Sequence, residues 1–550
     1  MPRPFAVRFL AALAVALGCL TFLAAPPAGA TDSTWTSRFE GGWSDAANWS
    51  NGVPNGIGDV ARFAGLPGVT IESSTQGAGI VLGTLYLPPT NPAAMYSGKL
   101  SIKSSSEKKL IFDSNSGAAL IQVMSYSSEY VYYNDVGPTI NAPVVLNVPL
   151  TVEVLGKTLT IARYITGGAG ITKTGPGLLV LAPDANNDPP NTYGPLVISE
   201  GIVCCRYSGY SSSKTVLNGG VLDNGGFRTS TFTPSLRSGI EWTASGGFGA
   251  SKNYFTINID GNAVPSTVTW GVGGFVPIGC ELVLGAPTSA DTTELMNPID
   301  FGGRVGIIRA DSVGGFLSTT YSVLSGRLSN GGLTKVGNGT LSLTAANAYV
   351  GATTVSEGAV RAVDGIGLPN PSNLILAGGV FINDADSATF TRGLGPGAGQ
   401  VQWAGSGGFG SSLANFQVNI GGSATPETLV WGTNSFVLND AELVLGARTT
   451  WLNPLNLGGR ACTVRVLENT GKPAPVLAGA ITGAAGSALV KTGPGTLLVS
   501  ATGLVADNVD VVVSEGTLDF QSYSDTVGVL TLSGGTVAGT GVLTGSHYDV

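Results

Sequence analysis

The sequence predicts an all-β protein, a parallel β-helix (β-solenoid) built from internal repeats, and three observations support this fold class. The 550 residues include 82 glycines, while charged residues make up only 11%. So few Lys, Glu and Arg cannot cover the outer faces of helices, which favours strands and tight turns. Short runs alternate apolar residues with Thr and Ser, and a Lys-x-Gly-x-Gly motif occurs three times along the chain.

Residues 1–30 are predicted to be a secretory signal peptide. Two arginines precede an uncharged apolar run over residues 9–25, and residues 28–30 form a cleavage site of the A-x-A type. The run is short for a membrane span of roughly 20 residues, so we expect cleavage after Ala30 and a secreted or cell-surface mature chain that does not span a membrane. Loss of two arginines changes the net charge from −8 to −10. An acidic chain without a basic cluster argues against nucleic acid as a partner.

Residues 31–100 are predicted to cap the solenoid and to supply its first strands. Trp35, Trp43 and Trp49 lie close together in this region. One interpretation is that they cover the first coil, whose open edge would otherwise recruit other chains. The alternative is a flat platform on which sugar rings stack. We favour the covering role.

Residues 101–550 are predicted to form the stacked coils. Lys173, Lys335 and Lys491 occupy matching positions 162 and 156 residues apart, and the segments between them also match, as in CELVLGAP from 280 and AELVLGAR from 441. A recurrence of this kind is typical of solenoids and repeat arrays. The three repeats lie near residues 167–203, 331–360 and 486–518.

The local pattern within a repeat predicts short strands and corners. Leu341 and Leu343 alternate with hydroxyl residues, so one face of this strand is apolar and the other polar. Each inward Leu or Val contributes roughly 1.5–3 kcal/mol when fully buried, and the outward Thr and Ser are expected to face water. Gly358 is expected to take a positive φ at a corner. A pair of β-sandwiches is the alternative architecture.

The stretch LTKVGNGTLSLTAANAYVGATTVSEGAVRA, starting at residue 333, closely resembles the autotransporter-associated β-strand repeat, also called the passenger-associated transport repeat. The resemblance implies a secreted or surface-exposed right-handed β-helix, of a kind associated with export of a passenger and its folding outside the cell. The residues that carry it in the three copies, which we assign structural roles, are Lys173, Gly175, Gly177, Lys335, Gly337, Gly339, Leu341, Leu343, Val355, Gly358, Lys491, Gly493 and Gly495.

Residues suited to chemistry are scarce. The single histidine, His547, lies three residues from the C-terminus, which makes a Ser-His-Asp triad improbable and excludes a His-rich zinc site. Asp184 to Asp188 could hold Ca²⁺ through oxygen ligands, although a polar loop is the preferred interpretation. Four mature cysteines leave three possible pairings open. We therefore predict no catalytic, cofactor-binding or metal-binding residues. The cysteines are Cys204, Cys205, Cys280 and Cys462.

The expected function is that of an exported, non-enzymatic repeat protein, a surface structural or adhesin-like passenger. The alternatives are a polysaccharide-active enzyme and a carbohydrate-binding protein on the same scaffold. Surface glycans and cell-envelope components are the expected partners, together with self-association through the open end of the β-helix. No translocator segment is recognisable after the last repeat, which leaves export by a separate machine and an incomplete sequence as alternatives.

Overall fold

The structure of the protein is a computed structural model. The described residues are 29–37, 39–63, 68–72, 75, 77–88, 100–105, 107–124, 137–156, 158–206, 213–225, 231–314 and 321–549. Most of the predicted signal peptide, residues 1–28, lies outside this part of the chain. Within it the secondary structure consists of strands and one short 3₁₀ helix, η1 (Ala46–Asn48). No helix in these segments has the length and apolar character needed to cross a membrane.

The strands form long sheets in which every strand pairs with its neighbours in parallel. Within a sheet, a strand pairs with the strand one coil earlier and the strand one coil later, as β15 (Ile171–Thr174) does with β12 (Leu150–Val154) and β17 (Leu196–Ile198), and the strands at the sheet ends pair on one side only. Counted over the described residues, the four largest sheets contain 16, 13, 9 and 7 strands. Parallel pairing between successive coils confirms the predicted parallel β-helix and rules out the pair of antiparallel sandwiches.

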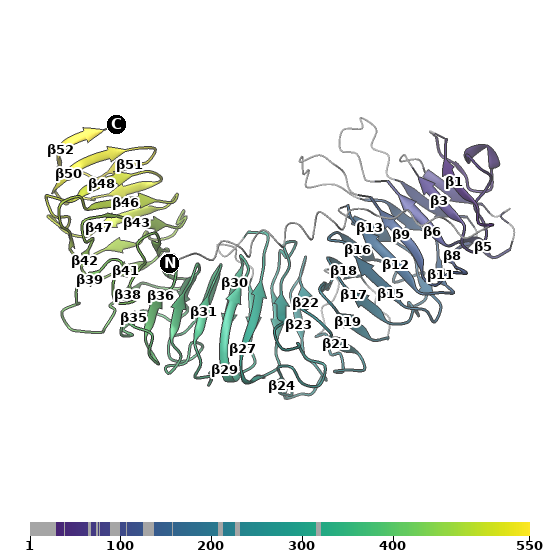
Figure 1. Ribbon diagram of the computed structural model, residues 1–550, viewed down its shortest axis with the longest axis horizontal. Coiled ribbons are helices and arrows are strands. Elements are labelled where there is room, and N and C mark those ends of the chain that lie inside the picture. The colour runs from purple at the N-terminus through teal and green to yellow at the C-terminus, as the bar shows by residue number, and fades with distance from the viewer. Residues whose placement is uncertain are drawn as a thin grey trace, which may run out of the picture.

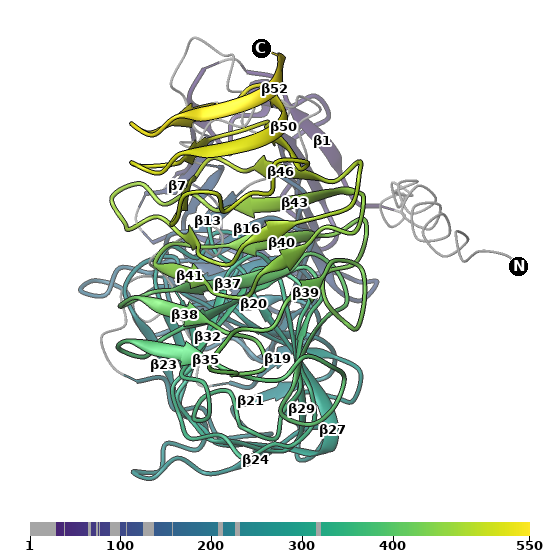
Figure 2. The same ribbon diagram turned by 90° about the vertical axis from the view of Figure 1, so that its left-hand side faces the viewer.

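The coils stack into an arch, with the N-terminal and C-terminal coils at its two raised ends (Figure 1) and the coils wound one above another in the perpendicular view (Figure 2). Two long strands, β27 (Ile299–Ala310) and β29 (Leu328–Val336), lie at the bottom of the arch. The start of β27 pairs with β24 (Val268–Thr269) and its end with β25 (Glu281–Leu284), so it runs along two faces of the solenoid. A register shift in the pairing of β27 with β29 separates the two faces.

The interior holds a continuous column of apolar side chains. Leu343, at the end of β30 (Thr340–Leu343), pairs in register with Leu324 one coil earlier and Ala362 one coil later. All three side chains are at most 2% exposed. Identical spacing in successive coils places these residues directly above one another, which removes most of their apolar surface from water.

The outer face of β30 differs from the expectation. Ser342 and Thr340 were expected to face water, but they are only 4% and 1% exposed. Ser342 lies in register between Val323 and Arg361, two larger residues on the neighbouring strands. Larger neighbours on the same face cover a small hydroxyl, so an outward position is not necessarily a solvated one.

Two apolar clusters also occupy outer faces of the solenoid. One contains Ile202, Val221, Val283 and Ala286, and the other contains Val380, Val444 and Leu467. Cys204 and Cys205, on opposite faces of β18 (Ile202–Cys205), are both only 2% exposed. Cys205 belongs to the interior core, and Cys204 lies in register between Val180 and Asp223 on the outer face.

Candidate functional site

The three repeat lysines lie at equivalent corners of the solenoid and are completely buried. Lys173, Lys335 and Lys491 each have 0% exposure. Each stands at or near the end of a strand, β15, β29 or β46 (Ala488–Thr492). A tight turn then leads to the next face through β16 (Leu178–Leu181), β30 or β47 (Thr496–Val499). We call each such turn, together with the Ser-Glu-Gly segment of the following coil, a lysine corner.

The ammonium group of each lysine is held by main-chain carbonyls. Nζ of Lys335 donates to Val336 O at 2.9 Å and Gly337 O at 2.6 Å, both in its own turn. It also donates to Glu357 O in the next coil at 3.1 Å. An ammonium has three N–H donors, so these carbonyls match its hydrogen-bonding capacity. Each lysine therefore joins two successive coils.

The other two lysine corners have the same geometry. Lys173 Nζ donates to Thr174 O, Gly175 O and Glu200 O at 2.8, 2.6 and 3.2 Å. Lys491 Nζ donates to Thr492 O, Gly493 O and Glu515 O at 2.9, 2.6 and 2.8 Å. Three independent copies with matched partners indicate that the motif specifies a packing unit.

Glycines give the ammonium access to these carbonyls. Gly337, in the turn after the lysine, has a φ of 85°. Gly358, expected to take a positive φ, has a φ of 61° and packs directly on the turn. A Cβ at Gly358 would lie 2.6 Å from Gly337 O and 2.9 Å from Lys335 Nζ. Only a residue without a side chain fits both the backbone conformation and this close approach.

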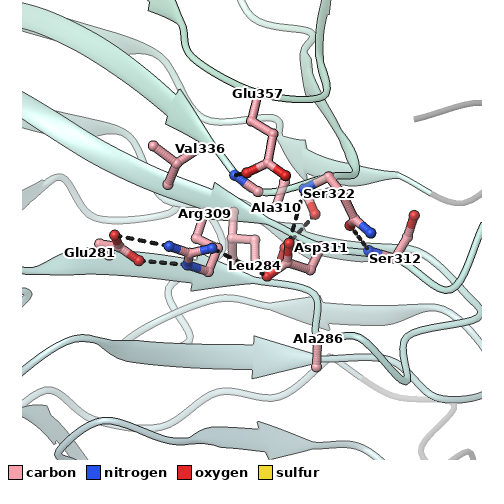
Figure 3. A network of polar contacts seen from close by, with 12 residues as sticks. Glu281, Leu284, Ala286, Arg309, Ala310, Asp311, Ser312, Ser322, Val336 and Glu357 are labelled. Carbon is pink, nitrogen blue, oxygen red and sulfur yellow. Dashed lines mark hydrogen bonds and ion pairs between the residues drawn. The ribbon is translucent and has the colours of Figure 1, made fainter. Parts of the chain in front are cut away.

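Acidic side chains lie beside the second corner, shown in Figure 3. The main-chain N–H of Gly337 donates to Glu357 Oε2 at 3.1 Å. Asp311 Oδ1 accepts from the main-chain N–H of Asn338 at 3.0 Å, and Arg309 Nε donates to Glu281 Oε2 at 2.6 Å. These contacts connect the coils that contain residues 281, 309–311, 335–338 and 357.

Burial lowers the pKa of the three lysines because removal from water disfavours the charged form. The pKa of Lys335 falls to about 7, an effect that the charges of Asp311 and Glu357 partly oppose. Burial likewise lowers the pKa of Lys173 and of Lys491 to about 8. The N–H donors of these lysines therefore lie in the protein interior, where their acceptors are main-chain carbonyls.

We expect the stability of the protein to rise with pH through Lys335. Its folded pKa of about 7 lies below the ordinary value of 10.5. Between these two values the unfolded chain binds more protons than the folded one, so raising the pH favours folding by at most about 1.4 kcal/mol per pH unit. Urea unfolding of the wild type and of Lys335→Met at pH 7 and pH 9.5 separates the contribution of Lys335 from those of the other titrating groups. If the free energy of unfolding of the wild type minus that of Lys335→Met is the same at pH 7 and at pH 9.5, the ammonium of Lys335 keeps its ordinary pKa.

The sequence did not reveal the carboxylate partners around the corners. Arg309 and Arg465 recur at matching positions, and their partners Glu281 and Glu442 lie in the two matching ELVL segments. Because an arginine and a glutamate both recur at matching positions of the long repeat, the sequence could have predicted that they pair. Asp311 and Asn338 have no comparable sequence signal, because their contact depends on how two coils stack.

The N-terminal tryptophans pack against one another. Trp35, Trp43 and Trp49 are 4%, 0% and 5% exposed. Their ring centroids lie 5.2 Å apart for Trp35 and Trp49 and 5.0 Å apart for Trp43 and Trp49, and Phe63 contacts all three. Rings buried in this way present no flat face to a sugar, so the stacking platform is not supported.

The acidic loop considered for Ca²⁺ uses its carboxylates internally. Asp184 accepts from the main-chain N–H of Asn186 at 2.9 Å and from Asn187 Nδ2 at 2.6 Å. Asp188 pairs with Arg163 Nε at 2.7 Å. Among the residues described by the structure, no group of three or more His, Cys, Asp or Glu side chains is placed to hold a metal ion.

Comparison with known proteins supports the interpretation of the repeat. The family model described as Passenger-associated-transport-repeat matches residues 333–362. This stretch contains the second lysine corner, from Lys335 to Gly358. Neither a curated protein nor a solved structure matches the chain. The predicted resemblance is thus confirmed, and the chain carries a passenger-associated transport repeat at residues 333–362 on a parallel β-solenoid.

Proposed function

We propose that this chain is an exported, non-enzymatic β-solenoid that serves as a surface structural or adhesin-like passenger. The observation that carries the proposal is the passenger-associated transport repeat at residues 333–362. Residues 1–30 would direct export and residues 31–100 would cap the first coil. The buried tryptophans beside β1 (Asp32–Trp35), the first strand in the order of its sheet, support the capping role.

The lysine corners suit a chain that folds coil by coil after crossing a membrane. Each coil offers a row of main-chain donors and acceptors to the next, and each lysine adds a bond to a carbonyl in the following coil. Repeat proteins of this kind gain stability from contacts between neighbouring units. A segment that emerges can therefore add to the existing stack without waiting for distant parts of the sequence.

The ion pairs of the described residues favour the structural role over an enzyme on the same scaffold. Glycoside hydrolysis commonly needs two carboxyl groups facing a shared substrate site. Here Glu281 pairs with Arg309, Asp188 with Arg163 and Asp384 with Arg361. Each of these carboxylates stabilises a contact within the fold.

The proposal predicts surface exposure without polysaccharide breakdown. Intact cells that express the full chain are treated with an external protease, and purified residues 31–550 are incubated with plant, algal and bacterial polysaccharides. We expect the protease to cleave the full chain, but not a chain lacking residues 1–30, and we expect no release of oligosaccharides. A full chain that resists the protease until the cells are lysed would contradict export. Release of oligosaccharides would contradict the non-enzymatic role.

A further inference from the structure

The two copies of the long repeat differ at one connection on the outer face. In the first copy, seven residues separate Gly285 from Thr293, where β26 (Thr293–Leu295) begins. In the second copy, only two residues separate Gly446 from Thr449, where β41 (Thr449–Trp451) begins. The strands on both sides match, so the difference lies in the connection itself.

The longer connection of the first copy closes the outer face. Ser289 Oγ accepts from the main-chain N–H of Ala250 at 3.2 Å and of Ala286 at 2.8 Å, which holds the connection against the sheet. A Cβ at Gly249 would lie 3.2 Å from Ser289 Oγ and from a methyl group of Val221. The space above Gly249 is therefore filled.

The shorter connection of the second copy leaves a pocket. It turns at Arg448, which has a φ of 63°, a conformation that is rare outside glycine. A pocket of about 80 Å³ lies over Gly410 and Gly446, at the positions that match Gly249 and Gly285.

Gly410 keeps the floor of this pocket hollow. No positive φ requires a glycine there, and a Cβ would meet its nearest heavy atom, Gly446 Cα, at 3.5 Å, an ordinary van der Waals distance. The backbone would accept a side chain at this position. The effect of having glycine there is that the space above the backbone stays open.

The lining of the pocket combines apolar and polar groups. Val380, Ile382 and Leu467 supply apolar surface. The guanidinium of Arg361 lies 4.6 Å from the ring centroid of Tyr321 and also pairs with Asp384, which fixes its position.

Three more polar side chains line the same pocket. Ser412, Glu468 and Lys472 add a hydroxyl, a carboxylate and an ammonium. Ser412 Oγ donates to Asp384 Oδ1 at 2.8 Å, which ties the wall to the Arg361 ion pair. Hydrogen-bond donors and acceptors are thus present around one apolar floor.

We propose that this pocket binds one sugar unit at the end of a glycan. A sugar ring has an apolar C–H surface and a rim of hydroxyl groups that both donate and accept, which matches this lining. A simple anion would face the carboxylate of Glu468, and an apolar ligand would remove the charged groups of Glu468 and Lys472 from water without new hydrogen bonds. A pocket of about 80 Å³ receives one edge of a sugar ring and leaves the rest in solvent, which suits a terminal unit better than the interior of a polymer. This proposal stands independently of the export role.

Saturation-transfer NMR on purified residues 31–550 tests the proposal. The probes are the methyl glycosides of glucose, galactose, mannose and glucuronic acid, with acetate as a simple anion. We expect at least one glycoside to receive saturation from the wild-type protein. Gly410→Val, which fills the floor, is expected to weaken that binding about tenfold or more, equivalent to about 1.4 kcal/mol.

Gly168→Val is the matched control. Gly168 has no positive φ, and a Cβ added there would have no heavy atom within 4 Å, so the same substitution is expected to leave binding unchanged. Circular dichroism and melting temperatures establish that both variants fold. Binding that persists in folded Gly410→Val, binding of acetate alone, or no binding of any glycoside would each overturn the proposal.

Discussion

Leu343→Asp is expected to destabilise the solenoid by about 4 kcal/mol or more, because it places a carboxylate without a partner in a dry column of side chains. Leu343 is 2% exposed and lies in register between Leu324 and Ala362. Urea unfolding followed by circular dichroism measures the loss. Because solenoid stability depends on contacts between neighbouring coils, the coils on either side should unfold at lower urea as well.

Val350→Asp is the matched control for this substitution. Val350 lies in the same repeat but is 68% exposed, so the added charge stays in water. We expect a change within about 0.5 kcal/mol, as for most surface substitutions. Equal effects at Val350 and Leu343 would show that Leu343 does not face the interior.

Gly358→Ala is expected to cost about 3 kcal/mol, the second large effect. Alanine must adopt a φ of 61°, and its Cβ would come within 2.6 Å of Gly337 O and 2.9 Å of Lys335 Nζ. The turn and the next coil would have to separate, which would break the bond from Lys335 Nζ to Glu357 O. Removal of that bond leaves a buried donor without its partner, a cost of roughly 1–3 kcal/mol in addition to backbone strain.

Gly471→Ala separates strain from steric overlap. Gly471 has a φ of 73°, close to that of Gly358, but a Cβ added there would have no heavy atom within 4 Å. We expect a loss of about 1–2 kcal/mol, the cost of the left-handed conformation alone. If the two variants lose equal stability in urea, the close packing at the lysine corner contributes nothing.

The lysine corner explains why a chain with few charges keeps a lysine at each of these positions. Lys173, Lys335 and Lys491 cross-link the turn of one coil to the next coil through main-chain oxygens. A shorter or apolar side chain would leave those carbonyls without their donors in a buried corner, where unmade hydrogen bonds are expensive. The repeat motif is therefore a device for stacking coils.

The pattern of residues by itself determined the fold class and the repeat. The alternation at Leu341 and Leu343 specifies which side chains point inward, because successive residues of a strand face opposite sides. The threefold recurrence of the Lys-x-Gly-x-Gly motif specifies a stack of similar coils, and the match at residues 333–362 agrees with it. Both signals are local, since a strand and its turn occupy only a few neighbouring residues.

Only the tertiary structure decided what covers each face and what each polar group contacts. The partner of Lys335 is a carbonyl 22 residues further along the chain. Ser342 is buried by larger residues on adjacent coils, and the pocket over Gly410 exists because the connection after Gly446 is short. A period of two says that a residue points outward, but the coil above or below it determines whether water, a neighbouring side chain or an empty pocket lies there.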